Sequence, residues 1–285
     1  VLKKCGLGHK NKLIEKGNIG KYMKLRKKYI NFGEKMKRNK INPIFTVINH
    51  YRPISDNEKL VERYHGRTPK KGRVDGRDLL VNFLDSLNQS AEFDYETLIV
   101  DNASDTIIDE FDIALTHNYI SLKDDKFGLT RAWNMAASFG YLNGNDFIVV
   151  CNDDITFNSS INNLFDTIEK SGYPSEDTLW GVVSDSGTSY HYSTKLEDGI
   201  KDVTDSNNHP VDGGLHGWFY AFHRDYFKKY NIDGKLFDET WKWSGGERFQ
   251  HNHRLRGGKQ CVVLSTLVKH DNGGSWRHNR DGCKL

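Results

Sequence analysis

One stretch decides the fold of this chain: DFIVVCNDD, residues 146–154. Its apolar run is short, β-branched and apolar on both faces, which is typical of a buried strand in a parallel sheet. The run ends in the paired carboxylates Asp153 and Asp154. Because open α/β sheets bind ligands at the carboxyl ends of their strands, these acids are candidates for a ligand or metal site.

Strand and helix patterns alternate upstream of this stretch. Residues 44–49 (IFTVIN) and 96–101 (ETLIVD) predict two strands, and residues 118–122 predict a short third one. Helices are expected over residues 78–89 and 128–142, where apolar residues recur on one face. This alternation predicts an α/β fold whose central, Rossmann-like sheet is mostly parallel and flanked by helices.

The second half of the sequence is less regular. Residues 179–184, 215–222 and 261–268 predict strands. The polar stretch 185–212 is long for a loop, which favours a functional flap, and residues 56–76 form a second insertion. We expect one main domain over residues 41–285.

Bulk composition narrows the class of protein. With 285 residues, 36% of them hydrophobic, the chain can bury one substantial core. The four scattered cysteines form no C-x-x-C pair, so neither a zinc knuckle nor a disulfide framework is indicated. No apolar window approaches the roughly 18 residues of a membrane span, and the first residues lack a signal peptide's apolar core. A soluble, cytoplasmic protein is expected.

Positive charge is concentrated in residues 1–40, which hold 14 lysines and arginines against two glutamates. The remainder has 27 basic and 36 acidic residues. Apolar residues recur every three or four positions over residues 19–36, which predicts a basic amphipathic helix in an N-terminal extension. Two interpretations have equal weight: peripheral contact with an anionic membrane surface through residues 19–38, or packing on the domain. Nucleic acid is not expected as a partner.

Five short motifs occur in the order of a known family. They are NHYRP (49–53), SLNQ (86–89), VDNASD (100–105), GLTRAWN (128–134) and NDD (152–154). Together they resemble the nucleotide-sugar half of GT-A glycosyltransferases, of the family 2 type that includes rhamnosyltransferases. GWFY (217–220), FDE (237–239) and GE (246–247) resemble that family's acceptor half. The resemblance spans residues 43–278 and implies a donor half over 41–157 and an acceptor half over 158–285.

The resemblance implies a divalent cation, Mn²⁺ or Mg²⁺, that bridges the donor's two phosphates as a Lewis acid. Asp154 would be a direct ligand of that metal, and Asp153 would bind ribose hydroxyls or a metal-bound water. His270 occupies the place of a third ligand. From the residues alone, adjacent acids after a strand also serve as helix N-caps, and a lone histidine is often structural.

The donor nucleotide is expected to contact residues near the ends of the first two strands. Asp101 would accept a hydrogen bond from the base, although a strand-ending aspartate is otherwise a turn former. Asn49 and Arg52 would line the same pocket, with Arg52 available for phosphate. Arg131 would reach the diphosphate from the following helix, or else lie on that helix's solvated face.

The acceptor hydroxyl needs a base, and the resemblance places a carboxylate at the start of a late helix. Glu247 matches that place, and Asp238 and Glu239 are alternatives because Arg248 stands where the family has a second acid. A base there implies a single in-line displacement with inversion at the sugar carbon.

Aromatic residues in the second half suit a carbohydrate acceptor, because sugar faces stack on aromatic rings. Trp218 is the candidate acceptor contact, and Trp241, Trp243 and Trp276 lie in the same acceptor half, although core packing explains at least half of these residues equally well. The histidine pair 251–253 spells a nuclease motif, but it lies in a helix-like stretch, which argues against a nuclease.

These features predict an enzyme, a metal-dependent hexosyltransferase that moves a sugar from a nucleoside-diphosphate donor of the UDP, GDP or dTDP type to a glycan or glycolipid hydroxyl. The first alternative is a non-catalytic carbohydrate- or membrane-binding module on the same fold. Two departures from the family favour it: Arg248, and residues 49–53, which lack the usual second residue of the family's tyrosine-asparagine-arginine turn. A nucleotidyltransferase is a weaker alternative, since residues 49–53 lack a Gly-rich, basic signature. The sequence does not define the nucleotide base of the donor, the donor sugar or the acceptor.

Overall fold

The structure is a computed structural model, and it describes residues 41–49, 76–104, 117–123, 128–185, 193, 195–204, 214–240 and 245–270. The side chains of residues 76–78, 245 and 247 are not described. The predicted basic helix in residues 1–40 and most of the 56–76 insertion lie outside these ranges. No helix among the described residues is long and apolar enough to cross a membrane.

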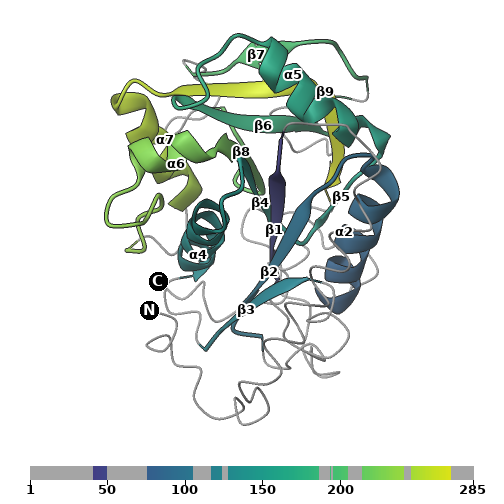
Figure 1. Cartoon of the computed structure of the whole chain (residues 1–285), viewed down its shortest axis with the longest axis vertical. Helices are drawn as coiled ribbons and strands as arrows, with labels where there is room; N and C mark the ends of the chain where they lie inside the picture. Colours follow the sequence, from purple (N-terminus) through teal and green to yellow (C-terminus); the bar gives the residue numbers. More distant parts are fainter. Residues whose placement is uncertain are drawn as a thin grey trace, which may run out of the picture. The chain divides into compact units, whose positions relative to one another are not determined.

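The first half forms a parallel sheet of four strands (Figure 1). They are β1 (Pro43–Asn49), β2 (Glu96–Asn102), β3 (Asn118–Leu122) and β4 (Phe147–Asn152). β1 lies between β2 and β4 and pairs with both in parallel. The helices α2 (Gly76–Ser90) and α4 (Gly128–Asn143) lie between the strands in sequence, as the apolar periodicity predicted.

The second half extends the same sheet with mixed strand directions. The strands after β4 are β5 (Ile155–Thr156), at the end of the first half, and β6 (Thr178–Ser184), β7 (Ile200–Asp202), β8 (Phe219–His223) and β9 (Lys259–His270) in the second half. The order across the sheet is β3-β2-β1-β4-β8-β6-β9-β5, and β7 also pairs with β9. β8 is antiparallel to both β4 and β6, whereas β6 and β9 are parallel. The sheet is therefore parallel across its first four strands and mixed beyond them.

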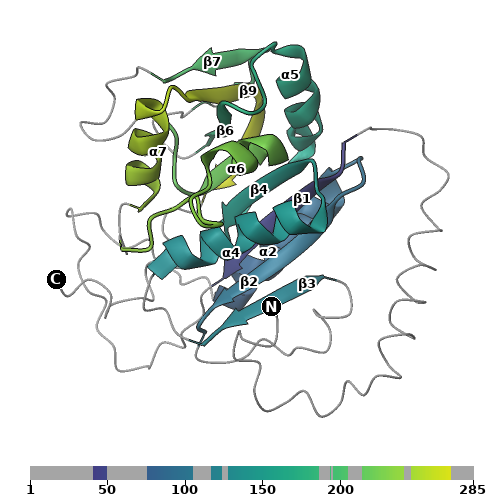
Figure 2. The ribbon, with the colours of Figure 1, turned by 60° about the vertical axis from the view of Figure 1, so that its left-hand side comes forward.

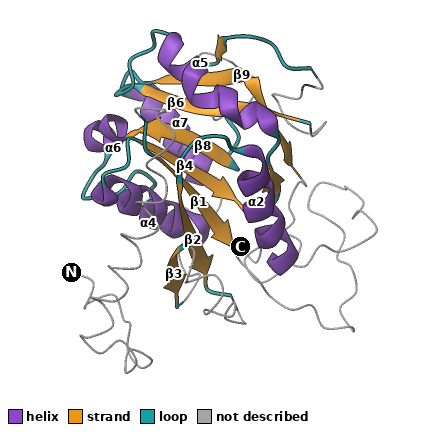
Figure 3. Ribbon diagram, turned by 45° about the vertical axis from the view of Figure 1, so that its right-hand side comes forward, coloured by secondary structure: helices purple, strands orange, loops and turns teal. Residues whose placement is uncertain are grey.

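Helices cover both faces of the sheet (Figures 2 and 3). One face carries α2, the 3₁₀ helix η4 (Ser159–Asn163) and α5 (Leu164–Lys170). The other carries α4, α6 (Arg224–Tyr230) and α7 (Gly245–Leu255). Alternate residues of β4 enter the two cores, with Val149 in the first and Val150 in the second. This alternation explains why the strand is apolar on both faces.

A glycine sets how closely α4 approaches the sheet. A Cβ on Gly140 would lie 2.8 Å from Ile148 Cγ1 and 2.9 Å from Ile44 Cγ2. Both isoleucines are fully buried strand residues. The helix backbone can therefore lie directly on β1 and β4, and this fixes the elements that carry the first half of the site.

Several elements differ from the sequence prediction, among them β5, η4 and α5, which were not predicted. β8 begins at Phe219 rather than at residue 215, because the main chain of Leu215 is hydrogen-bonded to the Gln250 side chain instead of to a strand. The polar stretch 185–212 contains the three-residue strand β7, which pairs with the edge of β9. Helix α6 was not predicted; His223 caps its first turn by accepting a hydrogen bond from the Asp225 backbone.

Candidate functional site

The two acids that follow β4 lie in a tight turn at the carboxyl edge of the sheet. Asp153 and Asp154 join β4 to β5, and both are buried. Asn49, the last residue of β1, donates a hydrogen bond from Nδ2 to Asp153 Oδ2 at 2.7 Å. The ends of β1 and β4 thereby fix the orientation of the Asp153 carboxylate, as expected for side chains that follow adjacent parallel strands.

His270 reaches the same turn from the end of β9. β5 pairs antiparallel with β9 so that Ile155 lies opposite His270. His270 Nε2 is 3.5 Å from Asp154 Oδ2, and the two side chains are 9% and 3% exposed. The structure thus brings together two predicted metal residues that are far apart in sequence.

Trp218 holds the His270 ring in an aromatic stack. The indole is stacked on His270 with centroids 4.8 Å apart at 26°, and on His216 at 5.6 Å and 20°. Its carbonyl accepts a hydrogen bond from Asn152 N at 3.0 Å, which ties the stack to the end of β4. His270 Nδ1 is buried without a hydrogen-bond partner among the described residues, so stacking orients the imidazole.

This stack bears on the acceptor role predicted for Trp218. The indole is only 6% exposed, and the imidazoles of His216 and His270 are both stacked on it. Little of the indole surface is therefore open to a sugar ring, and its acceptor role stays a prediction. Trp241, Trp243 and Trp276 lie outside the described residues.

Asp101 lies in the site but already has several protein donors. Tyr119 donates to Oδ2 at 3.0 Å and Ser121 at 3.4 Å, while Ser104 donates to Oδ1 from its backbone, at 3.1 Å, and from its hydroxyl. Ala103, inside this turn, has a φ of 59°, a left-handed conformation that is unusual for a non-glycine residue. The carboxylate therefore holds the turn after β2. The predicted contact of Asp101 with the nucleotide base stays a prediction.

The two predicted arginines differ in what the structure describes. Arg131 is half-buried in the first turn of α4, which begins at Gly128 with a φ of 58°. Arg52 lies outside the described residues, so its predicted phosphate contact stays a prediction. The start of α4 lies toward the carboxyl edge of the sheet, because this helix follows the parallel strand β3 in the chain.

Glu247 lies at the third position of α7, a helix that begins where the sequence predicted one. The preceding residue fixes the approach of this helix: a Cβ on Gly246 would lie 2.6 Å from Tyr220 Oη and 3.6 Å from Gly217 Cα. The first turn of α7 therefore lies against the chain that leads into Trp218. The Glu247 side chain itself is not described, so its role as the base stays a prediction.

The alternative bases have structural partners. Glu239 accepts hydrogen bonds from Lys235 Nζ at 2.8 Å and Asn134 Nδ2 at 3.1 Å. Hydrogen bonds from the hydroxyl and backbone of Thr240 lower the pKa of Asp238. A carboxylate with a lowered pKa is a weaker base, which argues against Asp238.

The histidine pair in α7 is not a nuclease site. His253 is buried, its Nδ1 is 3.1 Å from Tyr226 Oη, and its Nε2 is 2.8 Å from the Lys259 carbonyl. Burial lowers its pKa from 6.5 to about 4, which keeps the ring neutral at pH 7. His253 therefore packs α7 against α6 and the start of β9.

Sequence reasoning missed three contributors to the site. Asp185, just after β6, accepts a hydrogen bond from the His270 backbone at 3.2 Å. An acid directly after a predicted strand is the same signal that identified Asp153, so Asp185 could have been found. His216 and Asn152 contribute through stacking and through a backbone contact, and no sequence pattern identifies either kind of contact.

The donor atoms at Asp154 and His270 suit a divalent cation. Carboxylate oxygen and imidazole nitrogen are ligands that Mn²⁺ accepts, while Mg²⁺ prefers oxygen alone. Among the described residues there is no group of three or more histidine, cysteine or acidic side chains arranged as a complete metal site. Asp154 and His270 would supply two ligands to such a cation.

No protein-family model matches the sequence, and no relative is found among curated proteins. Solved structures share its architecture. S. aureus TarS 1–349 in complex with UDP superposes with a TM-score of 0.52 at 12% identity, over 84% of this chain and 63% of TarS 1–349. GalNAc-T7 with UDP, GalNAc and Mn²⁺ gives a TM-score of 0.51 at 12% identity, over 82% of this chain and 44% of that one.

The chain has the GT-A fold. A complex of TarS 1–349 with UDP-GlcNAc superposes similarly, with a TM-score of 0.52 over 83% of this chain and 61% of that one. The chain therefore spans less than two thirds of each of these solved chains. At such low identity the structural similarity establishes the fold alone. The ligands bound in these structures are ligands of TarS and GalNAc-T7.

Proposed function

We propose that this GT-A chain is a glycosyltransferase that moves a sugar from a nucleoside-diphosphate donor to a hydroxyl acceptor with the help of Mn²⁺ or Mg²⁺. One observation carries the proposal: His270 Nε2 lies 3.5 Å from Asp154 Oδ2 at the carboxyl edge of the sheet. The Asp153 carboxylate, fixed by Asn49, lies in the same turn. UDP, UDP-GlcNAc and Mn²⁺ in the structures of TarS and GalNAc-T7 support the same substrate class.

Buried side chains on the donor side of the site have separate roles. Asp154 and His270 hold the cation, which as a Lewis acid neutralises charge that develops on the departing diphosphate. Asp153 binds the ribose hydroxyls or a metal-bound water, in an orientation set by Asn49. Their burial strengthens each electrostatic contact, because little water screens it.

The remaining donor contacts come from the ends of β1 and β2 and from α4. Arg52 and Arg131 bind the diphosphate as guanidinium donors. Asp101 binds the base from the turn that it stabilises. UDP is the first nucleotide to test, because it is present in the TarS and GalNAc-T7 structures.

On the acceptor side, Glu247 takes the proton from the attacking hydroxyl, in a single displacement that inverts the sugar carbon. Its place in the first turn of α7, beside the chain that leads into Trp218, supports this role. The acceptor is a glycan or glycolipid hydroxyl, with Trp218 as its candidate aromatic contact. Anomeric configuration of the product, read by NMR, tests the inversion.

Turnover of sugar nucleotides tests the proposed function. We would incubate the protein with UDP-GlcNAc, UDP-glucose, GDP-mannose and dTDP-rhamnose, with Mn²⁺ or with EDTA, and measure release of the nucleoside diphosphate. Release from at least one donor in Mn²⁺ only, lowered in Glu247→Gln, is expected. A protein that binds a nucleotide but releases none from any donor is a binding module on the GT-A fold, and that result would reject the enzyme.

A further inference from the structure

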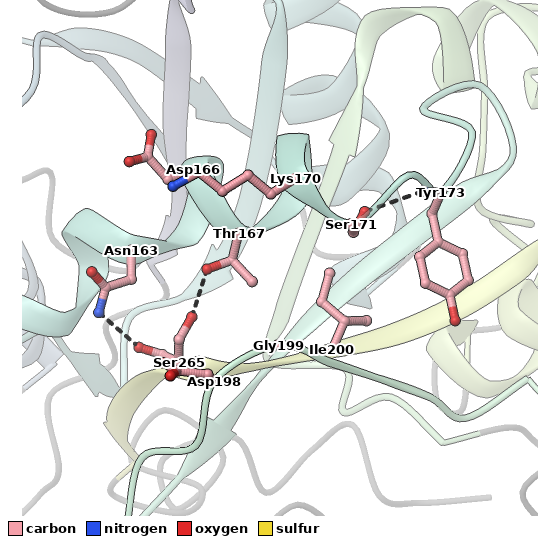
Figure 4. Close-up of a pocket in the computed structure, with 10 residues that line it drawn as sticks. All are labelled: Asn163, Asp166, Thr167, Lys170, Ser171, Tyr173, Asp198, Gly199, Ile200 and Ser265. Carbon is pink, nitrogen blue, oxygen red and sulfur yellow. Dashed lines mark hydrogen bonds between the residues drawn. The ribbon is translucent and has the colours of Figure 1, made fainter.

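A second concave region lies away from the carboxyl edge of the sheet. It is a groove of about 500 Å³ between α5, residues 198–200 and β9, here called the α5 groove (Figure 4). Its volume is within the range of sites that hold small ligands. Nothing in the proposed transfer reaction uses it.

Hydroxyl and amide groups line the inner part of the α5 groove. Thr167 points from α5 toward Ser265 of β9, and their hydroxyl oxygens are 2.8 Å apart (Figure 4). Asn163 Nδ2 donates to the Ser265 carbonyl at 3.2 Å. In the hydroxyl pair only one hydrogen is shared, so the accepting hydroxyl can still donate to a ligand. The Asn163 carboxamide oxygen has no partner among the described residues and can accept.

The other end of the groove is apolar and rigid. Tyr173 and Ile200 lie together there (Figure 4). The Tyr173 ring packs edge-on against the buried Trp180, with centroids 5.8 Å apart at 90°. Its backbone N–H also donates to Ser171 Oγ at 3.2 Å. A fixed aromatic ring beside hydrogen-bonding groups is the arrangement that accommodates the C–H face and the hydroxyls of a sugar.

Charge in the α5 groove disfavours an anionic ligand. The charged residues that line it are Asp166, Asp198 and Lys170, a net charge of one negative unit. None of the three has a hydrogen-bond or ion-pair partner among the described residues. Phosphate or nucleotide would be repelled on balance, whereas neutral hydroxyls can donate to the carboxylates and accept from the ammonium group.

We propose that the α5 groove binds a neutral oligosaccharide. Ser265 lies five residues before His270 on β9, a separation of at most about 17 Å, because β9 is irregular between Val263 and Leu267. A glycan held in the groove therefore has its next units within reach of the carboxyl edge of the sheet. The groove then anchors an extended acceptor remote from the transferred sugar, a role that rests on the proposed function.

Direct binding to the folded chain tests the proposal without turnover. We would titrate ¹⁵N-labelled protein with cellotetraose, maltotetraose and chitotetraose and follow the amide signals of Thr167, Gly199 and Ser265. At least one tetrasaccharide should shift these signals, and Asp198→Ala and Lys170→Ala should each weaken its binding about tenfold. Both positions are exposed, so neither substitution removes a buried contact. Asp85→Ala, an exposed aspartate on α2, should bind like the unaltered protein.

Three results would overturn the saccharide site: no shift with any tetrasaccharide, equal binding by all variants, or tighter binding of inorganic phosphate at the same amides. Titration of the same samples with UDP and Mn²⁺ separates this proposal from the proposed function. Intact UDP binding with no saccharide shift rejects only the groove. Saccharide binding in the groove without UDP binding rejects the donor site. The groove then remains a saccharide site, but its role as an acceptor anchor is rejected as well.

Discussion

The two halves of this chain build their parts of the site by different means. In residues 41–157, parallel apolar strands pair through their backbones, and polar residues follow directly at the strand ends. In residues 158–285, buried polar side chains hold the chain. Gln250, 1% exposed, is hydrogen-bonded to the backbone N–H and carbonyl of Leu215 and to Tyr220 Oη, and it accepts from Gln260 through its own carbonyl.

This difference affects how each half positions its site residues. Asn49, Asp153 and Asp154 follow from strand order alone, since neighbouring parallel strands end at one edge. Trp218 depends on the Leu215 segment that Gln250 holds, and the helix of Glu247 depends on contacts of α7. A buried polar network is strong when complete and costly when broken. We therefore expect the second half to be more sensitive to small substitutions than the first.

The largest effect on stability is expected for Gly258→Ala in the second half. A Cβ there would lie 1.8 Å from His253 Cε1, so the buried ring must leave or the backbone must shift. Either change breaks the contacts of His253 with Tyr226 and the Lys259 carbonyl. Overpacking together with two lost hydrogen bonds should lower the free energy of unfolding by about 3 kcal/mol or more in urea denaturation.

Gly217→Ala is the matched control for this substitution. Its Cβ would be 3.6 Å from Trp133 and from Tyr220 Oη, which are ordinary contact distances. Its free energy of unfolding should stay within about 1 kcal/mol of that of the unaltered protein. Equal stabilities of the two variants would show that the His253 contacts do not hold α7.

A pH-dependent loss of stability is expected from the same histidine. Burial holds the pKa of His253 at about 4 in the folded chain, against 6.5 for an ordinary histidine. Between these values the unfolded chain binds a proton that the folded chain does not, so stability falls as pH falls from 6.5 to 4. The loss should reach about 3 kcal/mol at most.

His253→Gln isolates this contribution from those of other titrating groups. Urea denaturation of both proteins at pH 7 and at pH 4.5 gives the acid-dependent loss of each. The unaltered protein should lose more stability than the variant over this interval. The same loss in both proteins would mean that His253 titrates normally in the folded state.

A smaller effect is expected in the first half for Gly140→Ala. The added Cβ would meet Ile148 and Ile44 at 2.8 and 2.9 Å, but it also gains alanine's helix propensity within α4. The net loss should be about 1–2 kcal/mol, below that of Gly258→Ala. Thermal denaturation of both variants shows which substitution destabilises the protein more. A larger loss of stability for Gly140→Ala than for Gly258→Ala would contradict the claim that the second half is the more sensitive one.

The smallest effect is expected for Trp218→Leu, which removes the ring that orients His270. Aromatic stacking contributes about 1 kcal/mol, so Mn²⁺ affinity in the presence of UDP should fall about fivefold. Electron paramagnetic resonance of free Mn²⁺ measures this without turnover. Trp218→Phe keeps a ring and should lose less than Trp218→Leu. Unchanged Mn²⁺ affinity in both variants would leave Trp218 without a role in positioning His270.

Sequence patterns were sufficient to predict the main strands and helices of the first half, because the spacing of apolar residues determines each of these elements. The apolar runs that predicted β1, β2 and β4 are strands buried on two faces, and the apolar stripe of α2 lies on the sheet. Strand order then placed Asn49 and Asp153 within hydrogen-bond distance. The predicted central α/β sheet and the resemblance to the GT-A fold are confirmed.

In the second half, contacts between distant residues determine the structure, and a local pattern does not show them. The start of β8 is set by Gln250, and the orientation of His270 by Trp218 and by pairing with β5. The sequence identified His270 through the family resemblance, but nothing in it indicated that Trp218 covers that histidine. The roles predicted for Arg52, Glu247 and Arg131 stay predictions.

Calorimetric titration of UDP, GDP, dTDP and CDP, each with Mn²⁺ and with EDTA, tests the donor site most directly. The titration is done on the unaltered protein, on Asp154→Asn and on Asp85→Asn, an exposed control on α2. We predict that at least one nucleotide binds only with Mn²⁺, that Asp154→Asn weakens this binding by about 100-fold, and that Asp85→Asn leaves it unchanged. Binding that is equally strong in EDTA or in Asp154→Asn, or no binding of any nucleotide, would contradict the account.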